Sequence, residues 1–168
     1  KITITACGTA YYAGLVAKYW FEKFARLPVE IDVASEFRYR EVPMSSDGLM
    51  IVVSQSGETA DTLASLRYAK EQGQHIMAVV NVPTSTIARE SDVVMQTIAG
   101  PEIGVASTKA FTCQLATLAC IAVAAGRARG YISQEAEKRL VDALMSIPGL
   151  MSKVIMREHV IEALAREL

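Results

Sequence analysis

Four polar residues that could bind an anion lie within six positions of the sequence: Ser54, Gln55, Ser56 and Thr59. They follow a wholly apolar run, 49–53, and precede a segment with helical spacing. A helix start presents unpaired backbone N–H groups with partial positive charge, and hydroxyl groups beside them complete a cradle for phosphate. Gly57 would let the backbone come close to a ligand. This stretch therefore predicts a phosphate-binding turn that needs no lysine.

A structural alternative exists for the same residues. Ser56 or Thr59 could simply cap the helix while the neighbouring polar residues fill the turn. For a lone serine at a helix start we would favour the cap, but four such groups in six residues favour anion binding. The turn is not a P-loop, because the Walker glycine and lysine spacing is absent.

Two further polar turns precede segments with helical spacing. The first contains Gly8 and Thr9, directly after the apolar strand-like run 2–6. The second spans 102–109, where Ser107 or Thr108 could cap a long apolar helix. In that second turn we expect the backbone around Val105 to face outward.

The sequence offers no convincing catalytic group and no metal site. Cys7 would need a base to act as a nucleophile, and His75 and His159 are both predicted to lie on the surface away from it. Cys113 and Cys120 lie on one apolar helix without partner ligands, so we expect core residues rather than a metal centre. We expect no catalytic residue, metal or cofactor in this chain.

Strand-like and helix-like segments alternate along the chain, and five of them have strand character. The predicted strands are 2–6, 29–34, 49–53, 76–80 and 93–96. The predicted helices are 10–27, 60–72, 87–90, 108–126, 133–147, ended by Pro148, and 151–168.

This alternation predicts an α/β three-layer sandwich, in which helices cover both faces of a five-stranded parallel sheet and extra helices follow at the C-terminus. In a flavodoxin-like strand order, ligands bind where the order reverses, between the first and third strands. The turns 7–9 and 54–56 would then lie side by side.

Composition limits the possible partners. Half of the 168 residues are hydrophobic and the net charge is −1, so a basic surface for nucleic acid is not expected. The apolar run 115–125 is too short for a membrane span and is better explained as a core helix. Three cysteines without paired spacing and no signal peptide favour the cytoplasm. The chain begins at Lys1 rather than Met, so we expect it to be part of a longer protein.

Several stretches, taken together, resemble a known family. They are CGTAYYAG at 7–14, ASEFRYR at 34–40, SQSGETADTL at 54–63, NVPTSTIARESD at 81–92 and PEIGVASTKAFT at 101–112. The combination closely resembles the isomerase domain of the glutamine–fructose-6-phosphate aminotransferases, also called glucosamine-6-phosphate synthases. SQSGETADT is typical of sugar-isomerase (SIS) domains in general, and the other motifs narrow the resemblance to this family. It implies a first SIS domain at 1–150 and a C-terminal helix, 151–168, that leads toward a second SIS domain.

The resemblance implies a role for each predicted site residue. Ser54, Gln55, Ser56 and Thr59 would hold the phosphate of fructose 6-phosphate or glucosamine 6-phosphate. Gly8, Thr9, the Val105 backbone and Ser107 would line the sugar.

The resemblance also implies a division of labour. Enzymes of this family take ammonia from glutamine in a glutaminase domain and make glucosamine 6-phosphate, and their acid and base groups come from outside the first SIS domain. We therefore expect the chain to be inactive alone, to work with the second SIS domain and the glutaminase domain, and to form a homodimer. The alternatives are a non-catalytic phosphosugar-sensing SIS module and a structural helical module. ASEFRYR with EIGVASTKAFT favours the enzyme, and a structural module would leave the hydroxyl cluster without a purpose.

Overall fold

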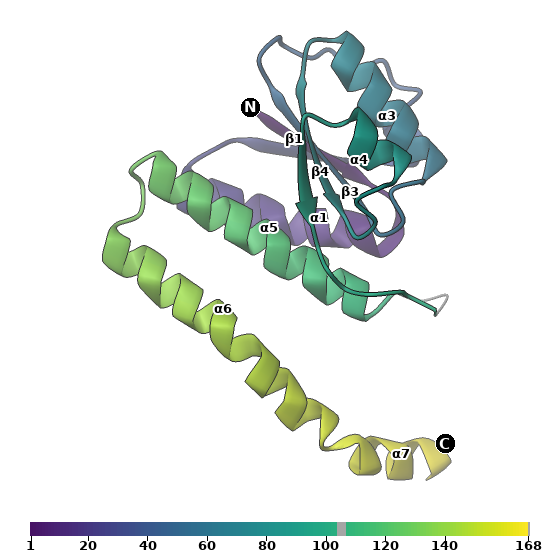
Figure 1. Cartoon of the computed structure of the whole chain (residues 1–168), viewed down its shortest axis with the longest axis vertical. Coiled ribbons are helices and arrows are strands. Elements are labelled where there is room, and N and C mark those ends of the chain that lie inside the picture. Colours follow the sequence, from purple (N-terminus) through teal and green to yellow (C-terminus); the bar gives the residue numbers. More distant parts are fainter. Residues whose placement is uncertain (104–106, 168) are drawn as a thin grey trace. The chain divides into compact units, whose positions relative to one another are not determined.

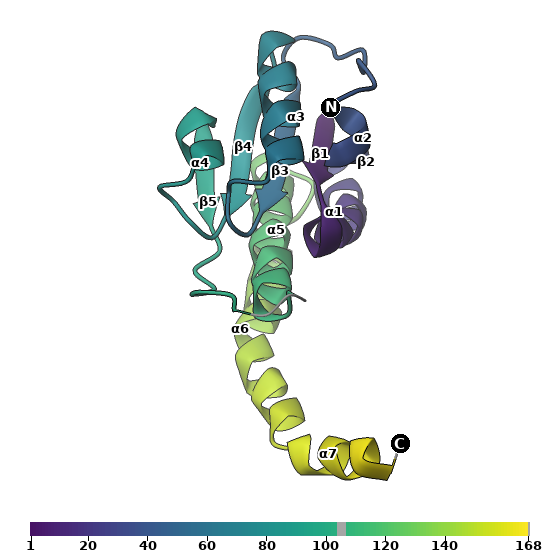
Figure 2. The same ribbon diagram turned by 90° about the vertical axis from the view of Figure 1, so that its right-hand side faces the viewer.

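The computed structural model describes every residue of the chain except 104–106 and 168. Within the described residues, five parallel strands form one sheet in the order β2-β1-β3-β4-β5. The strands are β1 (Ile2–Ala6), β2 (Val29–Val33), β3 (Leu49–Ser54), β4 (His75–Val80) and β5 (Val93–Gln96). Figure 2 shows them from β5 at the left to β2 at the right. The predicted parallel sheet and its flavodoxin-like order are confirmed.

The apolar character of each strand reflects its position in the sheet. The central strands β1 and β3 are buried along almost their whole length, as expected for strands covered on both faces. The edge strand β2 carries acidic residues at alternate positions and is only partly buried after Val29. Register places Ile4 of β1 between Ile31 of β2 and Ile51 of β3. The sheet is therefore most apolar at its centre, where both helical layers meet it.

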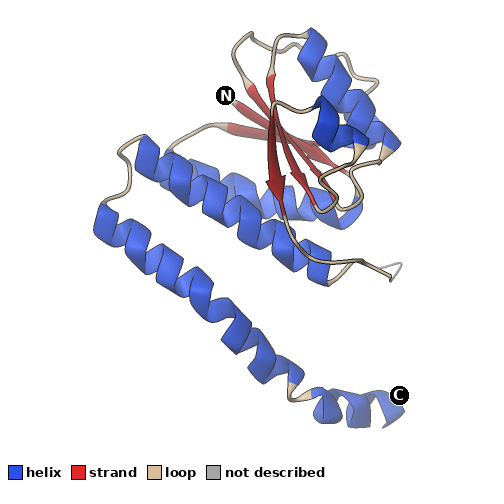
Figure 3. Cartoon of the chain, viewed as in Figure 1, coloured by secondary structure: helices blue, strands red, loops and turns tan. Residues whose placement is uncertain are grey.

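Helices cover both faces of the sheet, as the three-layer prediction requires. Figures 1 and 3 show the sheet between α3 and α4 on one side and α1 and α5 on the other. The first layer contains α2 (Ala34–Phe37), α3 (Ala60–Glu71) and α4 (Thr86–Glu90). The second contains α1 (Gly8–Trp20), the π-helical turn η1 (Phe21–Ala25) and α5 (Lys109–Ala128). Each layer has its own apolar core against the sheet, one around Leu66 and the other around Phe21 and Leu118.

The helix predicted at 10–27 is present, but its last turn widens to π geometry and it ends early. Arg26 adopts a left-handed conformation with φ of 53°, which stops the helix two residues before Pro28. The Arg129 side chain donates a hydrogen bond to the Ala25 carbonyl at 2.9 Å. The guanidinium thus satisfies a carbonyl that the helix end leaves free.

By length and composition alone, α5 could span a membrane. Its buried stripe nevertheless packs against α1 and the sheet, and Leu118 and Ala122 belong to the core there. This packing agrees with the predicted core helix.

Cys113 is half-buried, but Cys120 is exposed, so the prediction of a core position is wrong for Cys120. Position 120 is two residues from Leu118 and Ala122, which places it on the opposite face of the helix.

A separate compact unit starts at residue 133 and contains α6 (Gln134–Ile155) and α7 (Glu158–Glu167). Ser133 caps α6 as predicted, because its hydroxyl accepts the Ala136 N–H at 3.2 Å. The prediction that Pro148 ends this helix is wrong, since α6 continues through it. The helix is exposed there, so water can hydrate the carbonyl that loses its N–H partner. The predicted domain boundary at 150 remains a prediction.

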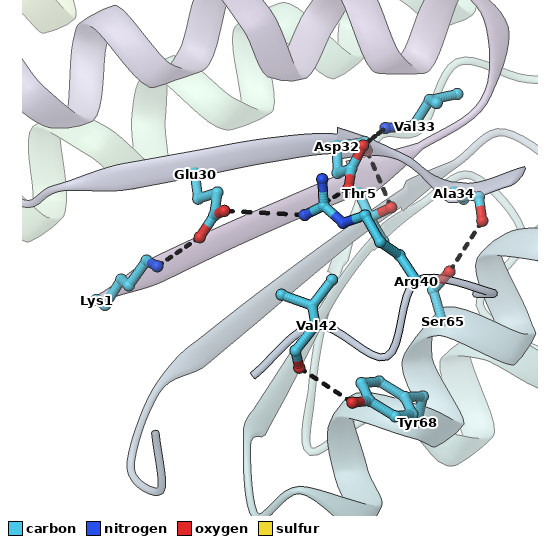
Figure 4. A network of polar contacts seen from close by, with 10 residues as sticks. All are labelled: Lys1, Thr5, Glu30, Asp32, Val33, Ala34, Arg40, Val42, Ser65 and Tyr68. Atoms are coloured by element: carbon cyan, nitrogen blue, oxygen red, sulfur yellow. Dashed lines mark hydrogen bonds and ion pairs between the residues drawn. The ribbon is translucent and has the colours of Figure 1, made fainter. Parts of the chain in front are cut away.

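A polar network secures the edge strand β2 and the segment after it (Figure 4). Lys1 forms an ion pair with Glu30, and this hydrogen bond lowers the pKa of the Glu30 carboxyl from its ordinary value. Arg40 lies 3.0 Å from Asp32, and the Thr5 hydroxyl donates to the Asp32 carbonyl at 3.1 Å. Arg40 of the ASEFRYR motif therefore holds its own loop against the sheet.

Candidate phosphosugar site

A hollow of about 400 Å³ opens at the carboxyl ends of β1 and β3. Its lining comprises Cys7, Gly8, Thr9, Ala10, Val53, Ser54, Gln55, Ser56, Thr59, Ser107 and Gln114. Every predicted site residue that the structure describes is among them. Val105 lies outside the described residues. Three turns that are far apart in the sequence are thus brought together at one place.

The strand order explains why the hollow forms there. The chain leaves β1 into α1, which packs on one face of the sheet, and leaves β3 into α3, which packs on the other. Neighbouring strands whose following helices turn to opposite faces leave a crevice between them. The two polar turns flank this crevice, as predicted from the order of the elements.

The turn after β3 holds its hydroxyl groups in defined positions. Ser54 is buried, and its hydroxyl accepts the Gly57 N–H at 3.0 Å and lies 3.1 Å from the Thr59 hydroxyl. The exposed Ser56 hydroxyl accepts the Glu58 N–H at 3.2 Å. Thr59 occupies the N-cap position of α3, yet its side chain makes no capping bond. The alternative in which Ser56 or Thr59 merely caps the helix is therefore not what the structure has.

Two helices begin at the hollow without a side-chain cap. The helix α1 starts at Gly8 after Cys7, and α3 starts at Ala60 after Thr59. Gly8 has φ of 58°, and a Cβ added there would meet nothing within 4 Å. Both helix starts direct partial positive charge toward the hollow. An anion bound here would gain two helix N-termini and several hydroxyl donors.

The phosphate turn is fixed on the start of α4 through Gly57 and Glu58. The Gly57 carbonyl accepts the Ile87 N–H at 3.0 Å, and the Glu58 carboxylate accepts the Thr86 N–H at 2.7 Å. This backbone hydrogen bond lowers the pKa of Glu58 from its ordinary value. Gly57 has φ of 68°, and a Cβ added there would lie 2.0 Å from the Ser85 Oγ. The glycine is thus required by close packing within the protein, a reason that the sequence did not reveal.

The third turn differs from its prediction. Neither Ser107 nor Thr108 caps α5, because Thr108 at the N-cap position makes no side-chain capping bond. The Glu102 carboxylate does so instead, accepting the Ala110 N–H at 3.0 Å, and it lies 3.5 Å from the Ser107 hydroxyl. A carboxylate is the stronger partner for a helix start, since its charge opposes the helix dipole. Ser107 is left at the wall of the hollow.

Sequence reasoning missed one polar residue of the lining, Gln114. It belongs to no recognised motif and is almost fully buried on α5. The signal that could have identified it is a single polar residue on an otherwise apolar helix face.

The described lining contains hydroxyls, side-chain amides, the Cys7 thiol and backbone groups, and it contains no histidine and no carboxylate. His75 and His159 are exposed and lie outside it, as predicted. Among the described residues no three histidine, cysteine or acidic side chains gather in a way that could hold a metal ion. The described lining thus offers hydrogen-bond donors to a polar anion.

Comparison with known proteins defines the class first. Residues 1–124 match the family model of the SIS domain, which is well over half of the chain. The chain therefore belongs to the SIS domain family.

Two curated relatives are aminotransferases. The chain is 69% identical over 168 residues to glutamine–fructose-6-phosphate aminotransferase [isomerizing] of Bradyrhizobium diazoefficiens, and 66% identical to that of Mesorhizobium japonicum. All of this chain but only 28% of each relative is covered. The C-terminal domain of glucosamine-fructose-6-phosphate aminotransferase from Francisella tularensis superposes with a TM-score of 0.94 at 43% identity, covering 97% of this chain and 46% of that one. The resemblance predicted from the motifs is confirmed.

Proposed function

We propose that this chain is the phosphosugar-binding SIS domain of a glutamine–fructose-6-phosphate aminotransferase, and that it holds fructose 6-phosphate or glucosamine 6-phosphate by the phosphate group. One observation carries the proposal. The turn from Ser54 to Thr59 places its hydroxyls beside the uncapped start of α3, in a hollow at the switch point of the sheet.

The arrangement of the three turns suggests how the ligand lies. The phosphate would occupy the turn formed by Ser54, Gln55, Ser56 and Thr59, where donors are most concentrated. The sugar would then extend toward Gly8, Thr9 and Ser107 on the other walls of the same hollow. The role of the Val105 backbone as a further sugar contact remains part of the proposal.

In this proposal the chain contributes binding and other parts of the parent enzyme contribute chemistry. The chain spans 28% of its curated relatives, so most of such an enzyme lies elsewhere. The second SIS domain and the glutaminase domain would be its partners within the parent protein. We expect that the chain alone makes no glucosamine 6-phosphate, because neither a histidine nor a carboxylate belongs to the described lining. The three free cysteines are compatible with a cytoplasmic location, which we also propose.

The binding groups of the hollow are also compatible with a second candidate function, a phosphosugar-sensing module without catalysis. A sensor needs only binding groups such as those that the described lining supplies. The aminotransferase relatives, similar over the whole chain, favour the enzyme.

The binding proposal is tested by removing the phosphate from the ligand. Titration of the chain with glucosamine 6-phosphate and with glucosamine, followed by calorimetry or NMR, should give at least a roughly tenfold higher affinity for the phosphorylated sugar. Hydrogen bonds to a charged group are each worth about 1.5–3 kcal/mol, so losing even one of them is enough for this difference. Equal affinities, or no binding of either sugar, would refute the proposal.

We also propose that the isolated chain forms a homodimer through the apolar faces of α6 and α7. The large exposed apolar side chains there include Leu150, Val154, Ile155, Val160, Ile161 and Leu164. Exposed apolar side chains gathered on neighbouring helices are typical of an interaction surface, and in the parent protein the second SIS domain would cover it. Light scattering should give the mass of two chains, and Ile161→Asp with Leu164→Asp should give the mass of one. A wild-type chain that stays monomeric at high concentration would contradict this.

A further inference from the structure

Gln114 is a buried amide that the protein itself does not satisfy. It is 1% exposed, and its Oε1 atom has no hydrogen-bond partner among the described residues. Buried polar atoms nearly always have a partner, because an unsatisfied one costs free energy. A group left in this state within a binding hollow indicates a partner that arrives with the ligand.

The position of Gln114 on α5 makes the residue more unusual. The core-facing side of the helix includes Ala110, Gln114, Leu118 and Ala122, spaced four residues apart and all buried. Its other members are apolar and pack in the core. A leucine or methionine at this position would fill similar space without leaving an unpaired polar atom. Core packing therefore does not account for the glutamine.

Comparison with the other unsatisfied groups supports a role in the hollow. Three buried side-chain oxygens among the described residues lack a hydrogen bond, on Asp32, Thr62 and Gln114. The Asp32 oxygen has the Arg40 guanidinium 3.0 Å away, and Thr62 does not line the hollow. Gln114 alone of these three residues lines the hollow, together with the phosphate turn and Ser107.

We propose that Gln114 recognises a hydroxyl group of the bound phosphosugar and so contributes to specificity for the sugar rather than for the phosphate. This inference rests on the proposed function and names a further ligand contact in the same site. A carboxamide offers both a donor and an acceptor, and its two ends can exchange places by rotation. A hydroxyl can pair with either end, whereas a phosphate dianion can only accept. A sugar hydroxyl therefore suits the amide in either orientation, whereas the phosphate suits only its N–H end.

The test replaces the amide with an apolar side chain of similar size. Gln114→Met is the main variant and Gln114→Leu the second, so that a folding defect in one does not end the experiment. Each variant and the wild-type chain are titrated by NMR with glucosamine 6-phosphate and with ethyl phosphate, which has a phosphate but no hydroxyl. Thermal unfolding is measured in parallel.

We expect Gln114→Met to weaken binding of glucosamine 6-phosphate roughly tenfold and to leave the affinity for ethyl phosphate within about twofold of wild type. Its midpoint of unfolding should be equal to or higher than that of wild type, because an unsatisfied polar atom has been removed. Unchanged affinity for the phosphosugar would overturn the inference, with a buried water as the partner of the amide. An equal loss for both ligands would also overturn it and assign Gln114 to the general support of the site.

The proposed function and the role of Gln114 can be contradicted separately. If wild type binds glucosamine 6-phosphate and loses it through Ser56→Ala with Thr59→Ala but not through Gln114→Met, the proposed function stands and this inference falls. If wild type binds neither ligand, the proposed function itself is wrong, and this inference falls with it.

Discussion

Replacing Ser56 and Thr59 together with alanine should weaken binding of glucosamine 6-phosphate by at least roughly 100-fold, because each lost hydroxyl removes a hydrogen bond to a charged phosphate worth about 1.5–3 kcal/mol. The fold should tolerate the change. Ser56 is exposed, and the buried Ser54 hydroxyl still accepts the Gly57 N–H when the Thr59 hydroxyl is gone. Calorimetric or NMR titration of the double variant measures the effect.

A matched control separates this effect from general surface changes. Ser46→Ala with Thr84→Ala makes the same two truncations at exposed positions outside the hollow. The control should bind the phosphosugar with the affinity of wild type. If the site variant and the control bind equally well, the phosphate does not lie in the turn from Ser54 to Thr59.

Gly57→Ala should cause a large loss of stability for a single methyl group. The residue has φ of 68°, where a side chain is strained, and its Cβ would lie 2.0 Å from the Ser85 Oγ and 2.4 Å from the Ser85 Cβ. Ser85 is buried and caps α4, so it cannot move away freely. We expect the free energy of unfolding to fall by about 3 kcal/mol, and the midpoint of thermal unfolding by about 6–12 °C.

Gly73→Ala is the control that isolates the contact with Ser85. Gly73 also has a positive φ, of 79°, but a Cβ there would meet nothing within 4 Å. Its substitution should cost only the backbone strain, about 1–2 kcal/mol. Adding Ser85→Gly to Gly57→Ala removes the clashing atoms and should recover part of the loss. If Gly57→Ala and Gly73→Ala lower the free energy of unfolding equally, the close contact of Gly57 with Ser85 does not limit what residue 57 can be.

The strands and their parallel arrangement could be predicted from the sequence, because strands buried on both faces are almost wholly apolar. The runs around Ile4 and Ile51 are almost wholly apolar, as central parallel strands must be. The predicted strand 93–96 agrees with β5 at both ends. A flavodoxin-like order of parallel strands places the ligand crevice between the first and third strands. The turns that contain Gly8 and Ser56 were therefore expected to lie side by side.

Features that depend on distant partners were not accessible in the same way. The cap of α5 comes from Glu102, eight residues before the amide that it binds, so local capping rules chose Ser107 or Thr108 instead. Pro148 was expected to end α6, but an exposed helix can tolerate one missing hydrogen bond.

The site shows the same division. Residues in turns after strands were identified because turn and helix-start chemistry is local. Gln114 was missed because its role depends on α5 packing beside the crevice, and no property of the neighbouring sequence shows where that helix lies. The tight contact of Gly57 with Ser85 is likewise a contact between segments far apart in the chain.

The central claim is that the phosphate of a sugar phosphate binds at the turn after β3. A crystal structure of the chain with glucosamine 6-phosphate tests it most directly. We predict phosphate oxygens within hydrogen-bond distance of the Ser56 and Thr59 hydroxyls and of backbone N–H groups at the start of α3. Density for the phosphate anywhere else, with the turn from Ser54 to Thr59 unoccupied, would contradict the account.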